Sequence, residues 1–478
     1  MKRGRPAGVG EIASEREDRG VRRLLARGGR LGFGRGLVVV WLLGLAVRLT
    51  DVLWLRWPHL PFGGDAFAYS GGANLFALGR GFVQPLSGFL GGPVRQTADH
   101  PPLYTLYLAL VAFFDPAKYT SQLTFMLWSC VLGTMTIVLV ALAARLIAGN
   151  RAGIIAGIIA AVYPGMWVHD GMLLSETMAL FTAAGVLLFA YRFSAKPSMW
   201  RGVWLGFWCG AAALARPELV LTVPLLVVPV VLLYSRVPWS RRLGWTAAAV
   251  ATSALVLAPW VGYNAARFKD PVLLSTNLGG TLVAANCHGT YYGKNMGFKD
   301  YECAHTNFQT VLAHHPNFGS LDQSQQDPLL RAQALKYVKS HIRRFPLVAG
   351  ARIGRILGFY QPFQEVEIEH VLLKQQRTVE FSLVVGFWIV GSLAVAGGVI
   401  LRRRRVPIWP AVVVPVIVAI SVATTFGQLR YRAPAEAAVV VLAAVAVDAG
   451  VTALWRRRER RGVDPESSAE PPVGALTP

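Results

Sequence analysis

The sequence predicts an all-helical protein that crosses a membrane roughly ten times. Three observations carry this prediction. Of the 478 residues, 54% are hydrophobic and 15% are charged, whereas a soluble domain carries about 25% charged residues. The mean hydropathy is +0.43, and apolar runs near the length that crosses a hydrocarbon core, about 20 residues, recur along most of the chain.

The basic residues indicate topology rather than nucleic-acid binding. The formal net charge is +22, but the arginines lie between apolar runs and not on one polar domain. Cytoplasmic loops are enriched in Lys and Arg, so we place all the basic connectors on that side. They are Lys2 to Arg35, Arg145 to Arg151, Arg192 to Arg201, Arg236 to Arg242, Arg402 to Arg405 and Arg456 to Arg461.

With these connectors inside, the chain order gives ten crossings. The segment 203–215 is short and glycine-rich, so it and its successor could instead form a broken helix or a re-entrant pair about Arg216-Pro217-Glu218. The predicted crossings are 37–55, 121–148, 152–168, 171–193, 203–215, 217–234, 244–262, 380–401, 408–426 and 435–455.

The apolar segment 101–114 is short for a crossing. If it crossed, every later basic connector would move outside, so we expect an interfacial helix under the outer leaflet. The alternative is that the segment is a short true crossing and that a change in the number of crossings elsewhere returns the basic connectors to the cytoplasmic side.

These assignments divide the chain into five parts. A basic, disordered cytoplasmic arm (1–36) precedes a transmembrane module (37–262) that includes a first outer loop (56–120). A large extracytoplasmic loop or small domain (263–379), C-terminal transmembrane helices (380–455) and a cytoplasmic tail (456–478) follow. Within the large loop, Asp327 and Pro328 suit a helix start, and residues 345–360 suit a membrane-surface helix.

The large loop also contains two of the four cysteines, Cys287 and Cys303. A disulfide between them is expected because the outer side is oxidising, with two free thiols as the alternative. Cys130 and Cys209 fall within predicted crossings, where they are expected to be small buried hydrophobic residues.

Two carboxylates are the leading candidates for chemistry. Asp65 lies in the first outer loop, and Glu176 begins a crossing at its outer end. A carboxylate within a membrane is costly and usually faces a polar cavity. The structural alternatives are a helix cap for Asp65 and an ion pair with Arg48 or Arg216 for Glu176.

A set of motifs resembles the GT-C superfamily of membrane glycosyltransferases, particularly the branch of protein O-mannosyltransferases and aminoarabinose transferases. Each motif is weak alone, but their order and their placement on one membrane face make the set fairly specific. They are Gly64-Asp65-Ala66-Phe67-Ala68-Tyr69, Gly79-Arg80-Gly81-Phe82, His100-Pro101-Pro102-Leu103-Tyr104, Leu174-Ser175-Glu176, Ala215-Arg216-Pro217-Glu218, Pro259-Trp260-Val261-Gly262-Tyr263-Asn264 and Arg430-Tyr431-Arg432-Ala433-Pro434.

The resemblance implies catalytic roles for Asp65 and Glu176. Asp65 would act as general base or would orient the acceptor. Glu176 would be the second acid across the cavity, and together the two carboxylates could hold a divalent cation, Mg or Mn, which remains an option only.

Basic side chains could bind the donor phosphate: His100, Arg216, Arg430 and Arg432. An interfacial histidine and arginines that snorkel to lipid headgroups are the alternatives. Contacts with sugar or acceptor are assigned to Tyr69, Tyr104, His169, Asp170 and Asn264, although loop hydrogen bonds and turns explain the last three at least as well.

The implied function is transfer of a sugar from a polyprenyl-phosphate donor to an extracytoplasmic protein, polysaccharide or glycolipid in cell-envelope biogenesis. The protein would be a multi-pass plasma-membrane enzyme with its active site on the extracytoplasmic face, in contact with the lipid bilayer and not with nucleic acid. A lipid-linked-sugar flippase and a noncatalytic envelope-assembly protein are the rival classes.

Overall fold

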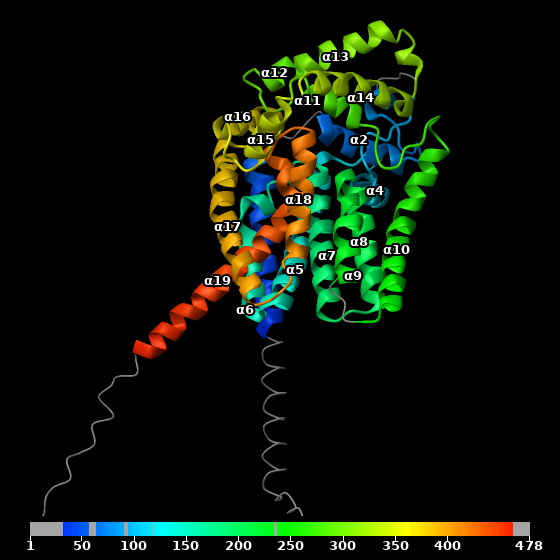
Figure 1. The fold of residues 1–478 in the computed structure, drawn as a ribbon. Coiled ribbons are helices and arrows are strands. Elements are labelled where there is room, and N and C mark those ends of the chain that lie inside the picture. Colours follow the sequence, from blue (N-terminus) through cyan, green and yellow to red (C-terminus); the bar gives the residue numbers. More distant parts are fainter. Residues whose placement is uncertain (1–31, 57–63, 90–93, 118, 234–236, 462–478) are drawn as a thin grey trace, which may run out of the picture.

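The computed structural model describes residues 32–56, 64–89, 94–117, 119–233 and 237–461, and over these ranges it contains helices and no strand. Six helices are long and apolar enough to cross a membrane, which confirms the predicted all-helical, polytopic fold (Figure 1). They are the first helix Gly32–Arg56, α5 (Gln122–Ala148), α7 (Ser175–Ala195), α10 (Trp239–Ala265), α17 (Arg377–Arg403) and α19 (Ala433–Arg461, whose apolar span Leu429–Arg457 includes the preceding turn η6, Leu429–Arg432).

Shorter helices occupy the four other predicted crossings. The alternative of a broken helix applies to one of them: α8 is continuous, but after Arg216 the chain forms the irregular helix Pro217–Leu233, in which Pro217, Pro224 and Pro229 interrupt the hydrogen-bond ladder. These elements are α6 (Asn150–Val162), α8 (Met199–Ala215), the run η3 (Pro217–Leu221), η4 (Val223–Val227) and α9 (Val228–Leu233), and α18 (Trp409–Thr424).

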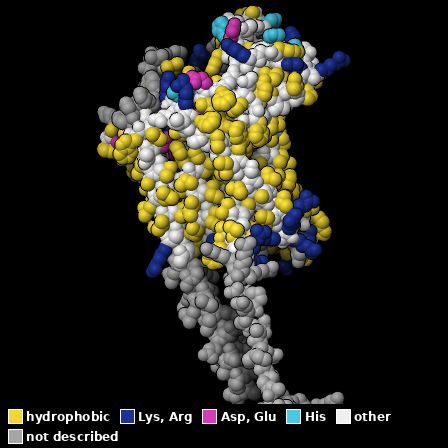
Figure 2. Space-filling view, turned by 90° about the vertical axis from the view of Figure 1, so that its left-hand side faces the viewer, with side chains coloured by type: hydrophobic (Ala, Val, Ile, Leu, Met, Phe, Trp, Pro, Cys, Tyr) yellow, Lys and Arg dark blue, Asp and Glu magenta, His cyan; other side chains and the backbone are white. Residues whose placement is uncertain are grey.

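The bundle has two chemically distinct ends. The connectors that carry Arg145 to Arg151, Arg192 to Arg201 and Arg402 to Arg405 meet at one, the basic end, where Figure 2 shows dark-blue side chains below a largely yellow belt. At the other, the loop end, short helices cap the bundle (Figure 1). They are α2 (Gly64–Ala77), α3 (Pro85–Phe89), α4 (Leu103–Phe114), α11 (Leu278–Ala285), α12 (His288–Tyr291), α13 (Tyr301–His314), η5 (Phe318–Ser320), α14 (Gln323–Ser340), α15 (Phe345–Ile356) and α16 (Pro362–Leu373).

Helix α4 corresponds to the segment predicted to lie at the interface. Its 12 residues span about 18 Å at 1.5 Å per residue, which is short of a hydrocarbon core of about 30 Å. Its last turn exposes the aromatic side chains of Phe113 and Phe114.

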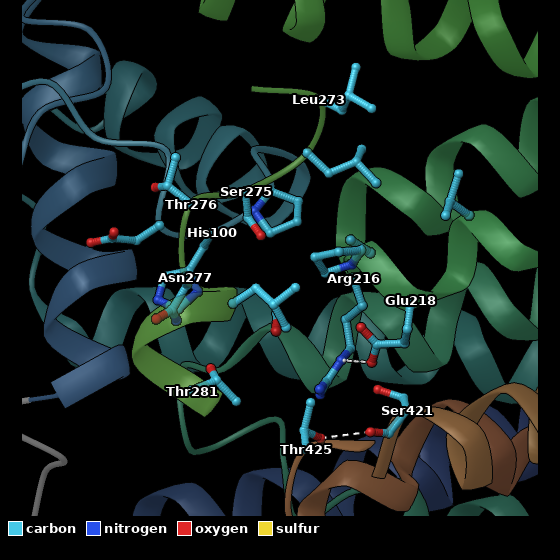
Figure 3. Close-up of a pocket in the computed structure, with 18 of the residues that line it drawn as sticks. His100, Arg216, Glu218, Leu273, Ser275, Thr276, Asn277, Thr281, Ser421 and Thr425 are labelled. Atoms are coloured by element: carbon cyan, nitrogen blue, oxygen red, sulfur yellow. Dashed lines mark hydrogen bonds and ion pairs between the residues drawn. The ribbon is translucent and has the colours of Figure 1, made fainter. Parts of the chain in front are cut away.

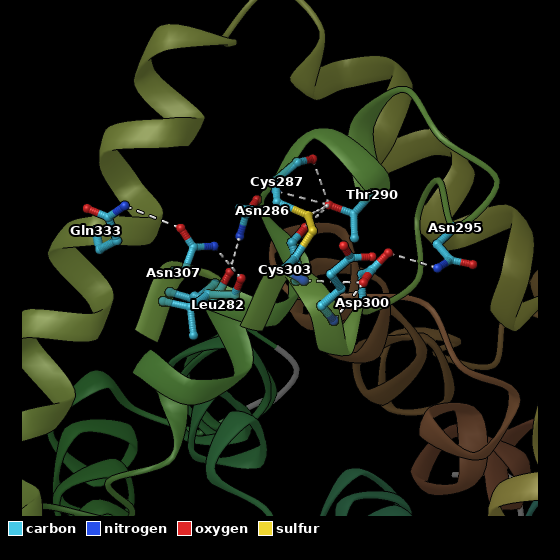
Figure 4. The surroundings of a disulfide bond; sticks show 12 residues. Leu282, Asn286, Cys287, Thr290, Asn295, Asp300, Cys303, Asn307 and Gln333 are labelled. Carbon is cyan, nitrogen blue, oxygen red and sulfur yellow. Dashed lines mark hydrogen bonds between the residues drawn. A yellow bond between two sulfur atoms is a disulfide. The ribbon is translucent and has the colours of Figure 1, made fainter. Parts of the chain in front are cut away.

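A disulfide joins the two loop cysteines that were expected to pair, Cys287 and Cys303, whose Cα atoms are 6.0 Å apart (Figure 4). Asp300 caps the start of α13 beside it by accepting hydrogen bonds from the backbone N–H groups of Glu302 and Cys303. The disulfide therefore ties the start of α13 to the junction between α11 and α12.

Both ends of the transmembrane region differ from the predicted boundaries. Residues 32–36, assigned to a disordered arm, belong to the first helix, and residues 456–461, assigned to the tail, extend α19. The rest of both predicted segments, 1–31 and 462–478, lies outside the described residues.

Residues 163–174 are not α-helical, although the predicted crossings 152–168 and 171–193 include most of them. Pro164 begins a 3-10 turn, and arginines of the first helix bind the carbonyl groups that follow. Arg48 Nη2 donates to the oxygen of Met166 at 2.8 Å, and Arg56 Nη2 donates to that of Val168 at 3.1 Å. Hydropathy does not distinguish this segment from a membrane helix, because its residues are buried in either case.

The large loop contains two further corrections. Helix α14 begins at Gln323 rather than near Asp327, because Asp322 accepts hydrogen bonds from the N–H groups of Ser324 and Gln325 in a capping box. In α15, Arg352 and Arg355 are fully buried instead of facing a membrane surface: Arg352 Nη2 donates to the oxygen of Ala285 at 2.7 Å, and Arg355 pairs with Glu365.

Helices α8 and α10 pack closely through three glycines spaced four residues apart, Gly202, Gly206 and Gly210, all buried in α8. The side chain of Ser253 in α10 donates a hydrogen bond to the Gly206 carbonyl oxygen at 2.8 Å. Small residues at this spacing allow helix backbones to approach one another in a membrane. The contact fixes the helix whose C-cap is Arg216.

Candidate active site

A cavity of about 630 Å³ opens at the loop end, between the bundle and the helices that cap it. Figure 3 shows His100 and Arg216 reaching into it from different sides. Its walls come from distant parts of the chain: α2, the start of α7, the α8–η3 turn, the loop segment 271–277, α14, α18 and η6. Six predicted site residues line it: Asp65, Tyr69, His100, Glu176, Arg216 and Arg430.

Asp65 lies in the first turn of α2, one residue after the helix begins, and its side chain is 42% exposed. Its Oδ2 accepts a hydrogen bond from Arg430 Nη2 at 3.0 Å, and its Oδ1 is 3.9 Å from His100 Nε2. Burial by itself would raise the pKa of the Asp65 carboxyl, but Arg430 and His100 outweigh that effect and hold it well below its usual range. Asp65 is therefore an accessible carboxylate that stays ionised.

Glu176 differs from Asp65 because it is 2% exposed and already shared by two arginines. Its Oε1 accepts a hydrogen bond from Arg216 Nη1 at 3.2 Å and lies 3.7 Å from Arg430 Nη1. Arg216 is one of the two ion-pair partners that the sequence analysis gives as the structural alternative for Glu176. Glu176 also lies in the first turn of α7, where the helix dipole favours a carboxylate.

Arg216 presents its guanidinium group to the cavity. Its Nε donates to Glu218 Oε1 at 2.6 Å, as Figure 3 shows, and its face lies 4.7 Å from the ring centroid of Tyr431. Arg430 lies over the same ring at 5.4 Å. Both guanidinium groups therefore lie near the aromatic ring of Tyr431, which attracts positive charge.

Aromatic contacts hold His100 in place. The rings of Tyr69 and His100 stack with their centroids 4.8 Å apart, and Tyr104 meets Tyr69 edge-on at 5.2 Å. Tyr104 does not itself line the cavity. It is fully buried, and its hydroxyl shares a hydrogen bond of 2.8 Å with Ser129.

His169 and Asp170 are close to Glu176 in sequence but do not line the cavity. Asp170 Oδ2 accepts a hydrogen bond from Arg48 Nε at 2.7 Å in the buried interior, and burial raises the pKa of its carboxyl to about 6 in spite of Arg48. His169 is also buried, and burial lowers the pKa of its ring to about 4. Both residues belong to the buried segment 163–174.

Asn264 and Arg432 also turn away from the cavity. Asn264 accepts a hydrogen bond from Arg267 Nη2 at 2.6 Å and is fully buried. Arg432 pairs with Glu436 one turn along α19 and donates to the carbonyl oxygen of Ile356. The tight turn η6 points Arg430 and Arg432 in different directions.

The cavity also includes residues that the sequence analysis did not select as site residues. Glu218 and Tyr431 belong to the quoted motifs. Their closeness in sequence to Arg216 and Arg430 was the signal that could have identified them as site residues. Segment 271–277, which carries Ser275, Thr276 and Asn277, has no such signal (Figure 3). It enters the cavity because of how the loop folds back over the bundle.

The divalent cation that Asp65 and Glu176 could hold stays a prediction. The guanidinium group of Arg430 contacts both Asp65 and Glu176, in the space a shared cation would need. Within the described ranges, no three His, Cys, Asp or Glu side chains gather as metal ligands. We therefore derive no step through a metal ion.

Comparison with known proteins relates the cavity to a family. Residues 99–263 match the sequence model of the family described as dolichyl-phosphate-mannose-protein mannosyltransferase. This segment carries His100, Glu176 and Arg216. No curated protein sequence matches the chain significantly.

Solved structures extend the likeness to the whole fold. The archaeal oligosaccharyltransferase AglB from Archaeoglobus fulgidus, in complex with an inhibitory peptide and a dolichol-phosphate, superposes with a TM-score of 0.55 at 13% identity, over 93% of this chain and 53% of that one. The same enzyme tethered to an acceptor peptide gives 0.53 at 16% identity, over 92% and 52%.

The chain thus spans about half the length of these oligosaccharyltransferases. ArnT from Cupriavidus metallidurans bound to undecaprenyl phosphate aligns over 92% of this chain and 82% of that one at 16% identity, with a TM-score of 0.41. The predicted resemblance is confirmed: part of the chain matches the mannosyltransferase family model, and its fold is similar to that of the oligosaccharyltransferase.

Proposed function

We propose that the protein transfers a single sugar from a polyprenyl-phosphate donor to a hydroxyl group of an extracytoplasmic acceptor. The observation that carries the proposal is the division of charge in the cavity. An accessible carboxylate, Asp65, lies beside two arginines, Arg216 and Arg430, that a buried carboxylate holds in place. Group transfer from a phosphate needs these two elements, one for the acceptor and one for the leaving group.

Arg216 and His100 bind the donor phosphate. A planar guanidinium group suits phosphate oxygens, and Arg216 projects into the cavity while Glu176 fixes it from the buried side. Glu218 pairs with the Nε side of the Arg216 guanidinium group, and the donor phosphate replaces it there. The polyprenyl chain leaves the cavity past its apolar wall, which includes Leu221 and Ile420.

Asp65 receives the acceptor proton. The acceptor oxygen forms a bond to the anomeric carbon while the bond from that carbon to the phosphate oxygen breaks, and its electron pair leaves with the polyprenyl phosphate. The hydroxyl proton goes to Asp65, so the charge lost there appears on the phosphate, where Arg216 stabilises it. Direct displacement inverts the anomeric configuration.

The basic end faces the cytoplasm and the cavity faces the opposite leaflet of the plasma membrane. The position of the basic connectors supports this orientation through the positive-inside rule (Figure 2). The cavity and the disulfide lie at the loop end, and a disulfide suits an oxidising compartment.

The test is transfer of label from radiolabelled polyprenyl-phosphate mannose in membranes that contain wild type, D65N or E176Q. We expect D65N to lose roughly 10²–10⁴-fold in rate, the usual contribution of a general base, and E176Q to raise the donor KM because it releases Arg216. The control is E367Q, an exposed residue of α16 that pairs only with Arg377 among its described neighbours. Undiminished transfer by both cavity variants would refute the assignment, and donor translocation without transfer would indicate a flippase.

A further inference from the structure

The proposed reaction does not yet use three uncharged polar side chains that line the cavity. They belong to Ser275, Asn277 and Thr281, which we call the polar wall. Figure 3 shows Asn277 and Thr281 on the opposite side of the cavity from Arg216 and Glu218. Within the described part of the chain, none of the three side chains of the polar wall makes a hydrogen bond. Their donors and acceptors are therefore available to a ligand.

The backbone of the polar wall is fixed, although its side chains are not bonded. The carbonyl oxygen of Leu274 accepts a hydrogen bond from Trp260 Nε1 at 2.9 Å. Thr276 donates its N–H to the carbonyl oxygen of Ala98 at 2.9 Å and its hydroxyl to Gln323 Oε1 at 3.0 Å. These partners belong to α10, the first outer loop and α14. The polar wall is thus held in place before any ligand binds, which lowers the entropic cost of binding.

Asn277 stands at the N-cap of α11, where an asparagine side chain usually accepts a hydrogen bond from the second or third N–H group of the helix. Its side chain makes no such bond. The side chain of Asp327 instead binds the N–H of Gly279, the second residue of α11. Asn277 is therefore not needed as a cap, and Thr281, four residues along, lies on the same face of the helix.

The proposed donor has three chemically distinct parts, and two of them already have a place in the cavity. Arg216 and His100 bind the phosphate, and the apolar wall that includes Leu221 and Ile420 accommodates the polyprenyl chain. The hydroxyl groups of a sugar both donate and accept hydrogen bonds, as do hydroxyl and amide side chains. We propose that the polar wall binds hydroxyl groups of the donor's sugar. This inference rests on the proposed function.

The position of the polar wall favours the sugar of the donor over the acceptor. Thr276, which lies between Ser275 and Asn277, is bonded to Ala98, two residues before His100. The sugar is joined directly to the phosphate that His100 binds, so it lies at this end of the cavity. A site built to bond a substrate hydroxyl discriminates strongly against an analogue without it. The polar wall therefore sets the specificity for the sugar.

The first measurement is binding in the absence of acceptor. It compares the dissociation constants of the purified protein for undecaprenyl phosphate and for undecaprenyl-phosphate mannose. We expect wild type to bind the lipid with mannose more tightly. N277A and T281A should each reduce this preference about 2- to 10-fold, the effect of one lost neutral hydrogen bond. Their constant for undecaprenyl phosphate should stay at the wild-type value, and T281S, which keeps the hydroxyl group, should retain the preference.

N317A is the matched control. Asn317 is also an N-cap residue whose side chain makes no capping bond, but it precedes η5 and does not line the cavity. This variant should bind both lipids as wild type does. The inference is overturned if wild type binds the two lipids equally, or if N277A and T281A keep the full preference. An equal loss of affinity for both lipids in these variants also overturns it, because that loss is not specific to the sugar.

The second measurement is kcat/KM for transfer from undecaprenyl phosphate that carries mannose or one of its monodeoxy analogues. Removal of the hydroxyl that Asn277 binds should slow wild type about 2- to 10-fold but should not slow N277A further, because its partner is already absent. Effects that add in full for every analogue, in N277A and T281A alike, contradict the inference. Full transfer by D65N would instead refute the proposed function, and the binding preference would still test the polar wall.

Discussion

The glycines of α8 give a prediction in which two chemically identical substitutions have opposite effects. A Cβ added at Gly206 would lie 2.1 Å from the carbonyl oxygen of Ala249 and 2.9 Å from its Cα. These are backbone atoms of α10, so no side chain can rotate to make room. A Cβ added at Gly202 would meet its nearest atom, the carbonyl oxygen of Trp245, at 3.5 Å, which is ordinary contact.

The magnitude follows from that geometry. Carbon contacts are optimal near about 3.5 Å, so G206A must push α8 and α10 apart by roughly 1 Å. Overpacking of this kind costs about 1–3 kcal/mol, and the separation also stretches the bond from Ser253 to the Gly206 carbonyl. Both variants gain about 1 kcal/mol of helix propensity. That gain cancels in their comparison, which leaves a difference of about 2 kcal/mol.

The assay is thermal unfolding of the purified protein in detergent, with both variants scanned at the same rate because unfolding of large proteins is often irreversible. We expect G202A to unfold at or above the wild-type temperature and G206A about 2 °C below G202A. G206A should also raise the donor KM, because the displaced helix ends at Arg216. A G206A melting temperature equal to or above that of G202A would refute the packing argument.

Three further predictions test other contacts. R48A should leave Asp170 buried without its partner, at a cost of roughly 3–5 kcal/mol in folding free energy. The variant should therefore fail to accumulate in membranes. The double variant R48M/D170L should recover the wild-type amount on immunoblots. C303S opens a disulfide whose cysteines are 16 residues apart and should lower the stability of the large loop by about 3 kcal/mol in the chain-entropy model. Limited proteolysis without reductant would show this, and wild type with reductant should match C303S. E218Q removes the anion that competes for Arg216, so the dissociation constant for undecaprenyl phosphate should fall several-fold in a binding titration, and an unchanged or higher value would contradict that role for Glu218.

Hydropathy and charge predicted most of the bundle because the crossings follow a rule that can be read from a single sequence: a long apolar run, with basic residues in the cytoplasmic connectors. The crossings near 121–148, 244–262 and 380–401 correspond to long helices α5, α10 and α17. The rule fails in segment 163–174, which is as buried as a helix but whose carbonyl groups bond to Arg48 and Arg56. Such contacts between distant segments leave no local periodicity.

The candidate site shows the same limit. Asp65 and Arg430, 365 residues apart, are joined by a hydrogen bond that the sequence analysis did not predict, although it placed both residues on one membrane face. Neighbours of site residues were less predictable, since Asp170 and Arg432 face away from the cavity although Glu176 and Arg430 line it. Which side of a turn faces the cavity depends on backbone geometry that spacing does not encode.

The first helix has a consequence for how the protein can assemble. Arg48 and Arg56 emerge from the ribosome long before the carbonyl groups of Met166 and Val168 that they bind. Until those later residues arrive, two arginines of an inserted helix have no partner from that segment. The loop end can therefore close only after α6 and α7 are in the membrane, and an unrelated membrane anchor cannot replace residues 32–56 without loss of the shape of the segment that leads into Glu176.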